Sequence, residues 1–167
     1  MWAFPHQRVP LNSNNSLLTI PGVIMQGHGV ASGVGADARY PNGTLSLQLP
    51  LFKALGLDLS KYHRATLNIS IRPHIWRMRN PCFTFRRVEW TQHHPPEDFS
   101  FSRGAVVFLG NRYDGWVYQP HPETKRDHFH NPSIVEFIAP LIPGITYGSA
   151  VEVLLHLDEV TVARSAN

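Results

Sequence analysis

Short stretches of alternating polar and apolar residues recur along the chain, which is the pattern of strands with one buried face. The alternation is clearest in residues 44–49 and 66–71, which are similar enough to suggest a weak internal repeat. Two strands obeying the same rule are the simpler interpretation. Further strands are predicted at residues 17–30, 83–90, 105–109, 116–118, 134–138 and 151–155.

Helical and turn signals complete this pattern. Residues 51–59 are the one segment that predicts a short helix, and residues 110–115 predict a hairpin turn because Asn and Gly tolerate positive φ. We expect residues 1–16 to form a flexible arm, residues 17–160 a single domain and residues 161–167 a tail. Short strands separated by many turns indicate a mainly β fold, a small β-barrel with one helix.

Composition narrows the class of protein further. The chain has 167 residues, of which 43% are hydrophobic and 16% charged, which excludes intrinsic disorder and a coiled coil. The net charge of +3 comes without any long basic run, which argues against nucleic-acid binding. Cys82 is the only cysteine, so a reducing compartment is favoured. We expect no secretory signal and no membrane span, and therefore a cytoplasmic protein.

Five of the ten histidines lie in two predicted loops, near several acidic residues. His128 and His130 are two residues apart, so an extended backbone would turn both imidazoles to one side. His121 or His93 could then complete a Zn²⁺ or Fe²⁺ site. Solvated loop histidines are the alternative, and the spacing matches no established metal-binding motif.

A glycine-rich segment at residues 29–35 could let backbone N–H groups approach a phosphate. It does not have the spacing of a P-loop, and it does not fit a dinucleotide-binding fingerprint. A bulged strand or a tight turn would use glycine equally well.

The order of four motifs resembles the archaeal CTP-dependent riboflavin kinases. The motifs are residues 29–35, 40–49, 109–120 and 134–140, and the resemblance spans roughly residues 23–157. It implies a six-stranded cradle-loop barrel. It also implies an enzyme that transfers the γ-phosphate of CTP to riboflavin with Mg²⁺.

The resemblance carries over to particular positions. Nucleotide-binding residues would be Gly33, Val34, Gly35, Ile138, Ala139 and Pro140. Thr44 matches a threonine that helps to hold Mg²⁺, and Ser46 stands where the family has asparagine. The sequence Thr66-Leu-Asn68 supplies the missing letters, but it lacks the preceding Tyr-Pro and glycine, so we prefer Thr44 and Ser46.

Other positions depart from the family. Residues 36–42 are much shorter than the family's corresponding segment, which includes a helix. The acceptor-side threonine falls on His128 and the acceptor-side glutamate on Ser133. Asp127, His128 or His130 would face the acceptor and could serve as a general base.

We therefore expect a phosphotransferase that acts on riboflavin or another small hydroxyl acceptor, with CTP and Mg²⁺. One alternative is a non-catalytic module on the same barrel that binds a nucleotide or flavin. The other is a metal-dependent enzyme with Zn²⁺ or Fe²⁺ at His121, His128 and His130.

Overall fold

A computed structural model describes residues 16–27, 39–125 and 130–166. The fold is mainly β, with 46% of the described residues in strands and 8% in helix. In chain order the elements are β1 (Leu17–Met25), α1 (Thr44–Ala54), β2 (Leu67–Ser70), β3 (His74–Met78), β4 (Phe83–Val88), β5 (Glu97–Phe108), β6 (Asn111–Pro120), β7 (Ile134–Ile138), β8 (Ala150–His156) and β9 (Val160–Arg164). The helix of the described residues has 11 residues, too few to cross a membrane.

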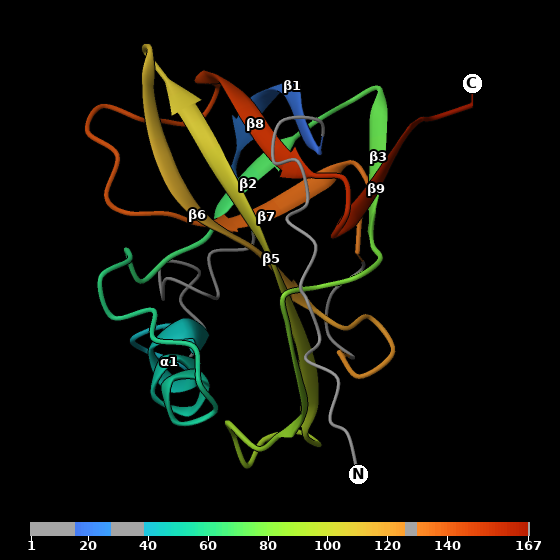
Figure 1. The fold of residues 1–167 in the computed structure, drawn as a ribbon. Helices are drawn as coiled ribbons and strands as arrows, with labels where there is room; N and C mark the ends of the chain where they lie inside the picture. The colour runs from blue at the N-terminus through green and yellow to red at the C-terminus, as the bar shows by residue number, and fades with distance from the viewer. Residues whose placement is uncertain (1–15, 28–38, 126–129, 167) are drawn as a thin grey trace, which may run out of the picture.

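Six strands form a closed hydrogen-bonded ring in the order β1, β2, β7, β6, β5, β8, and every pair of neighbours is antiparallel. The long strand β5 makes this closure possible because its two halves have different partners (Figure 1). Its first half pairs with β4, where Phe101 lies opposite Phe83. Its second half pairs with β8, where Ala105 lies opposite Leu154. Strands β3 and β9 form a separate two-stranded sheet.

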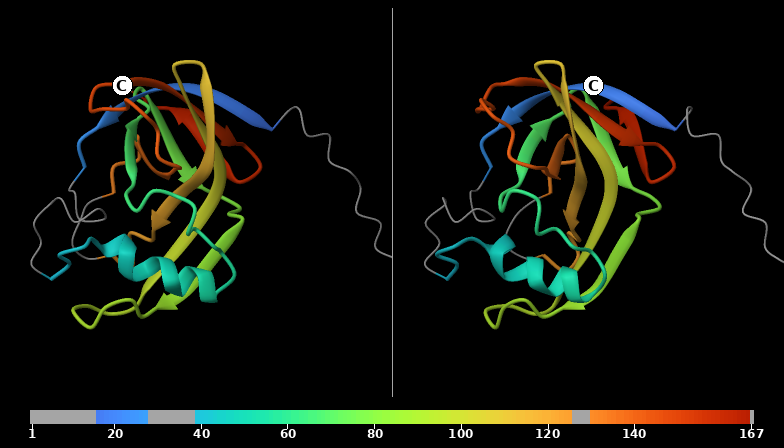
Figure 2. Two further views of the ribbon diagram at one scale, coloured as in Figure 1. Left: turned by 90° about the vertical axis from the view of Figure 1, so that its left-hand side faces the viewer. Right: turned by 60° about the vertical axis from the view of Figure 1, so that its left-hand side comes forward.

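Two hydrophobic clusters lie on opposite faces of β5, because successive side chains of a strand alternate in direction. Val106 and Phe108 belong to the cluster that also contains the inward residues of β2, β7 and β8. Phe99 and Phe101 belong to the other cluster, which covers one face of α1. There the Phe52 ring lies 5.1 Å from that of Phe99 and 5.0 Å from that of Phe101. Helix α1 therefore packs across the outside of the sheet (Figure 2).

The strand predicted at residues 44–49 is wrong, because these residues form the first half of α1. Leu45, Gln48 and Phe52 are buried and follow the spacing of three and four residues that brings side chains to one face of a helix. Leu45, Leu47 and Leu49 also fit an alternating pattern, and this pattern predicted the strand. The internal-repeat hypothesis fails with it, since one copy is helical and the other lies in β2.

Several boundaries also differ from expectation. The hairpin turn between β5 and β6 is only Leu109-Gly110, because the strands extend through most of the expected turn. Residues 161–164 of the expected C-terminal tail belong to β9, which pairs with β3 from His74 to Met78. The ring has six strands, the number that the family resemblance implies, whereas β3 and β9 were not predicted. The expected flexible arm lies outside the described residues, apart from Ser16.

Candidate functional site

The residues expected to bind nucleotide separate into two groups. Gly33, Val34 and Gly35 lie outside the described residues. Ile138 is the last residue of strand β7, and Ala139 and Pro140 follow it: the first two are buried, and Pro140 is half-buried. The carbonyl oxygen of Ala139 accepts a hydrogen bond from the backbone N–H of His63 at 2.9 Å.

Thr44 and Ser46, expected to hold Mg²⁺, lie in the first turn of α1 rather than at a strand end. Thr44 is buried. The hydroxyl of Ser46 donates a hydrogen bond to the carbonyl oxygen of Asn42 at 2.9 Å, which keeps it within the turn before the helix. This local bond is typical of a serine near a helix N-terminus. The alternating pattern that put both residues on a strand therefore gave the wrong geometry.

A cavity of about 150 Å³ lies at the ends of β1, β2, β6 and β7, and Gly27, Asn68 and Glu136 line it together. Asn68 of β2 pairs in register with Glu136 of β7. The Asn68 side chain lies directly against Gly27, where an added Cβ would sit 2.2 Å from its Nδ2 atom. A larger residue at position 27 would require the Asn68 side chain to move. Asn68 also lines a neighbouring cavity of about 60 Å³ together with Thr66.

His130 lies at the other side of the same cavity and packs edge-on against the Trp76 ring, with ring centres 5.8 Å apart. The indole N–H of Trp76 donates to the carbonyl oxygen of Ile134 at 2.7 Å, which fixes this wall. Burial lowers the pKa of His130, and the nearby charge of Lys125 lowers it further. His130 is therefore neutral at pH 7 and can accept a proton. Asp127 and His128, the other acceptor-side candidates, lie outside the described residues.

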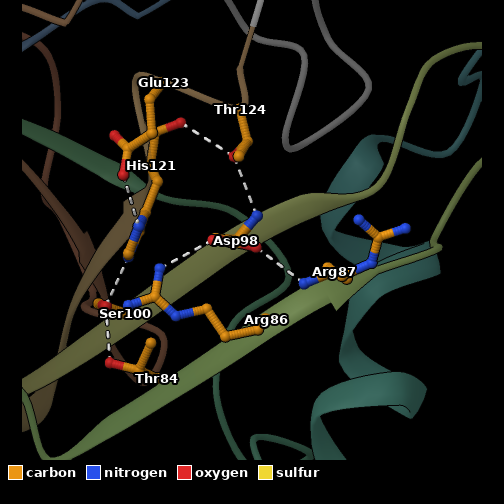
Figure 3. A network of polar contacts seen from close by, with 8 residues as sticks. All are labelled: Thr84, Arg86, Arg87, Asp98, Ser100, His121, Glu123 and Thr124. Atoms are coloured by element: carbon orange, nitrogen blue, oxygen red, sulfur yellow. Dashed lines mark hydrogen bonds and ion pairs between the residues drawn. The ribbon is translucent and has the colours of Figure 1, made fainter.

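A larger open groove, of about 550 Å³, adjoins this cavity and contains a polar network at its wall (Figure 3). His121 is at its centre, with Nε2 2.7 Å from the Ser100 hydroxyl and Nδ1 3.1 Å from the Glu123 carboxylate. The Ser100 hydroxyl is also 3.0 Å from that of Thr84 on the neighbouring strand β4. The network thus joins β4, β5 and the segment after β6.

A second branch of this network is centred on Asp98 (Figure 3). Its carboxylate accepts hydrogen bonds from the Arg86 guanidinium at 2.8 Å and from the backbone N–H of Arg87 at 2.7 Å. The Arg87 backbone bond, with the Arg86 bond second, lowers the pKa of Asp98. This carboxylate therefore stays ionised and positions Arg86 at the groove.

Hydrogen bonds run from Ser100 through His121 to Glu123, in the order of the nucleophile, base and orienting carboxylate of a catalytic triad. The burial of Ser100 argues against such chemistry. Ser100 is only 2% exposed and lies within β5, flanked by ladder pairs at Phe99 and Phe101. A nucleophile must reach its substrate, so we interpret the three residues as a structural network that fixes His121.

The expected Zn²⁺ or Fe²⁺ site requires three ligands. His121 and His130 line the same groove, while His128 lies outside the described residues. Within the ranges that the structure describes, no group of three His, Cys, Asp or Glu side chains could hold a metal ion. Oxygen donors of the kind that suits Mg²⁺ lie in the two neighbouring cavities that share Asn68: Glu136 lines the larger one with it, and Thr66 lines the smaller one.

Comparison with protein-family models and with curated proteins finds no match for this sequence. The sequence Thr66-Leu-Asn68 did indicate Asn68 as a Mg²⁺ ligand, but Thr44 and Ser46 were preferred. Glu136 carried no separate signal, because its position opposite Asn68 depends on the strand register.

Proposed function

We propose that this protein is a Mg²⁺-dependent phosphotransferase that moves the γ-phosphate of a nucleotide, with CTP favoured, to a small hydroxyl acceptor. The observation that carries the proposal is one cavity lined by Gly27, Asn68, Glu136 and His130. Gly27 lies two residues before the glycine-rich segment, Asn68 ends the Thr66-Leu-Asn68 sequence, and His130 belongs to the histidine loop. The closed ring of six strands is consistent with the cradle-loop barrel that the riboflavin kinase resemblance implies.

The metal ligands in this proposal are Thr66 and Asn68, with Glu136 as a third oxygen donor. This choice replaces Thr44 and Ser46 and removes a departure from the family. Helix α1 now stands between the glycine-rich segment and the Thr-Leu-Asn motif, where the riboflavin kinases also have a helix. A hydroxyl, an amide oxygen and a carboxylate form an oxygen set suited to Mg²⁺. Bound there, the ion would neutralise charge on the transferring phosphoryl group.

The acceptor hydroxyl is assigned to the His130 side of the cavity. A neutral imidazole can accept the hydroxyl proton, and the lowered pKa of His130 keeps it in that form at pH 7. The Trp76 ring and the bond from its indole to Ile134 restrict the wall on which His130 rests. Positioning of the two substrates then supplies most of the rate, as in other phosphoryl transfers.

The test is a coupled assay of CDP formation from CTP and Mg²⁺ with riboflavin and a panel of small alcohols. Asn68→Ala should raise the Mg²⁺ concentration needed for half-maximal rate, with Asn111→Ala on the exposed start of β6 as its control. His130→Gln should lower kcat by about 100-fold. Exposed Glu152→Gln on β8 is the control for Glu136→Gln.

The outcomes separate the three original hypotheses. Turnover that depends on Asn68 and His130 supports the phosphotransferase. Stabilisation of the fold by CTP without turnover would replace it with a nucleotide-binding module. Stoichiometric Zn or Fe after purification, with no response to any nucleotide, would contradict both in favour of a metal-dependent enzyme.

A further inference from the structure

The open groove beside the cavity carries an excess of positive charge. Arg77, Arg79 and Arg86 line it, and the carboxylate among its lining residues belongs to Glu123. Arg86 is paired with Asp98 and Glu123 is bonded to His121. Arg77 and Arg79 are exposed, and neither forms an ion pair with another described residue. Two guanidinium groups are thus available to a ligand.

The groove adjoins the acceptor side of the cavity rather than its nucleotide side. Trp76, Gln119, Pro122 and His130 line both spaces, so a ligand beside His130 can extend into the groove. Gly27 and Asn68, assigned to the nucleotide and its metal, line the cavity but are not among the groove residues.

We propose that the groove binds an anionic group, a phosphate or a carboxylate, on the acceptor substrate. The acceptor is then a negatively charged hydroxyl compound, and neutral riboflavin is a poor fit. This inference rests on the proposed function, because that function assigns the acceptor to the His130 side. Arginine is the residue best suited to such a group, since its planar guanidinium donates two parallel hydrogen bonds to a carboxylate or phosphate.

The test measures binding of phenyl phosphate, benzoate and neutral benzyl alcohol to the full chain by ¹H–¹⁵N NMR at low ionic strength. The indole N–H of Trp76 reports on the shared wall, and Trp76→Phe assigns its signal. We expect saturable shifts with at least one anion below about 10 mM and none with benzyl alcohol. Which anion binds more tightly identifies the charged group as phosphate or carboxylate.

The variant Arg77→Ala/Arg79→Ala should weaken this binding by about 10-fold or more. Arg112→Ala is the matched control, because Arg112 is an exposed arginine of β6 that pairs with Asp114 and does not line the groove. Equal binding by the double variant, or equal binding of benzyl alcohol, would overturn the proposal. Unchanged melting temperatures verify that these surface variants fold.

A second titration in the presence of saturating CTP and Mg²⁺ tests the assignment to the acceptor. Binding that persists supports it, whereas competitive displacement by CTP would assign the groove to nucleotide phosphates and overturn it. Arginine-dependent anion binding in a protein that neither binds nor turns over CTP would refute the phosphotransferase alone. Failure of the anion titration with normal CTP turnover would refute only the anionic acceptor.

Discussion

The hydrogen bond between Tyr118 and Gln48 holds helix α1 against strand β6, and its removal has a predictable cost. The Tyr118 hydroxyl donates to Gln48 Oε1 at 2.7 Å, and the two residues are 4% and 2% exposed. Tyr118→Phe keeps the ring but leaves the amide oxygen buried without this donor, which costs about 1–3 kcal/mol. At about 2–4 °C per kcal/mol for a chain of this size, Tm should fall by about 2–12 °C.

Urea unfolding followed by tryptophan fluorescence measures this loss as a free energy. Tyr113→Phe on the same strand is the control, because no described residue accepts a hydrogen bond from its hydroxyl. Gln48→Leu should be destabilising alone. The double variant Tyr118→Phe/Gln48→Leu should lose less than the sum of the two single losses, because no buried polar group is left unpaired.

Alkaline pH tests the burial of the same tyrosine. Burial raises the pKa of Tyr118 well above its usual value, so the unfolded chain loses this proton first as pH rises. The neutral phenol therefore contributes its full stabilisation below about pH 10, and this contribution is lost at higher pH. The Tyr118→Phe variant should not show this alkaline loss of stability. A loss under about 0.5 kcal/mol, or additive single variants, would refute the claim that this bond is a buried and exclusive contact.

Three other predictions concern the sheet and the site. Gly115→Ala should destabilise the fold by about 3 kcal/mol in urea unfolding, because its Cβ would lie 2.1 Å from the Ile138 carbonyl oxygen; an unchanged midpoint would contradict this packing. The lowered pKa of Asp98 means that it stabilises the fold above its unfolded pKa of about 3.9 and that this stabilisation is lost as pH falls through the lower folded value. Asp98→Asn should flatten that acid dependence. For His130, NMR titration should give a pKa below about 6.5, and a value at or above that would count against its role as a base.

Helix α1 illustrates where the sequence was ambiguous. Residues 44–49 satisfy the period of a strand, and Leu45, Gln48 and Phe52 satisfy the period of a helix. Local preference does not choose between them. The aromatic face of Phe85, Phe99 and Phe101 decides, because it offers a surface on which the helical arrangement buries Leu45 and Phe52 completely.

The candidate site was only partly predictable for a related reason. The sequence alone identifies residues whose side chains suit a hard cation or a phosphate, and these candidates included Asn68 and His130. Their convergence could not be deduced, since it depends on the pairing of β2 with β7 and on the closeness of Gly27 to Asn68. Arg77 and Arg79 line the same groove beside β3, which the order of residues along the chain does not show.

The mainly β class and the approximate positions of most strands of the ring follow from local patterns, because alternation and turn residues act over a few positions. The division of β5 between β4 and β8 and the pairing of β9 with β3 depend on the folded chain. These are contacts between segments far apart in the chain. These contacts stabilise the fold through burial and hydrogen bonding across the closed sheet, and such long-range contacts cannot be predicted from a local sequence pattern.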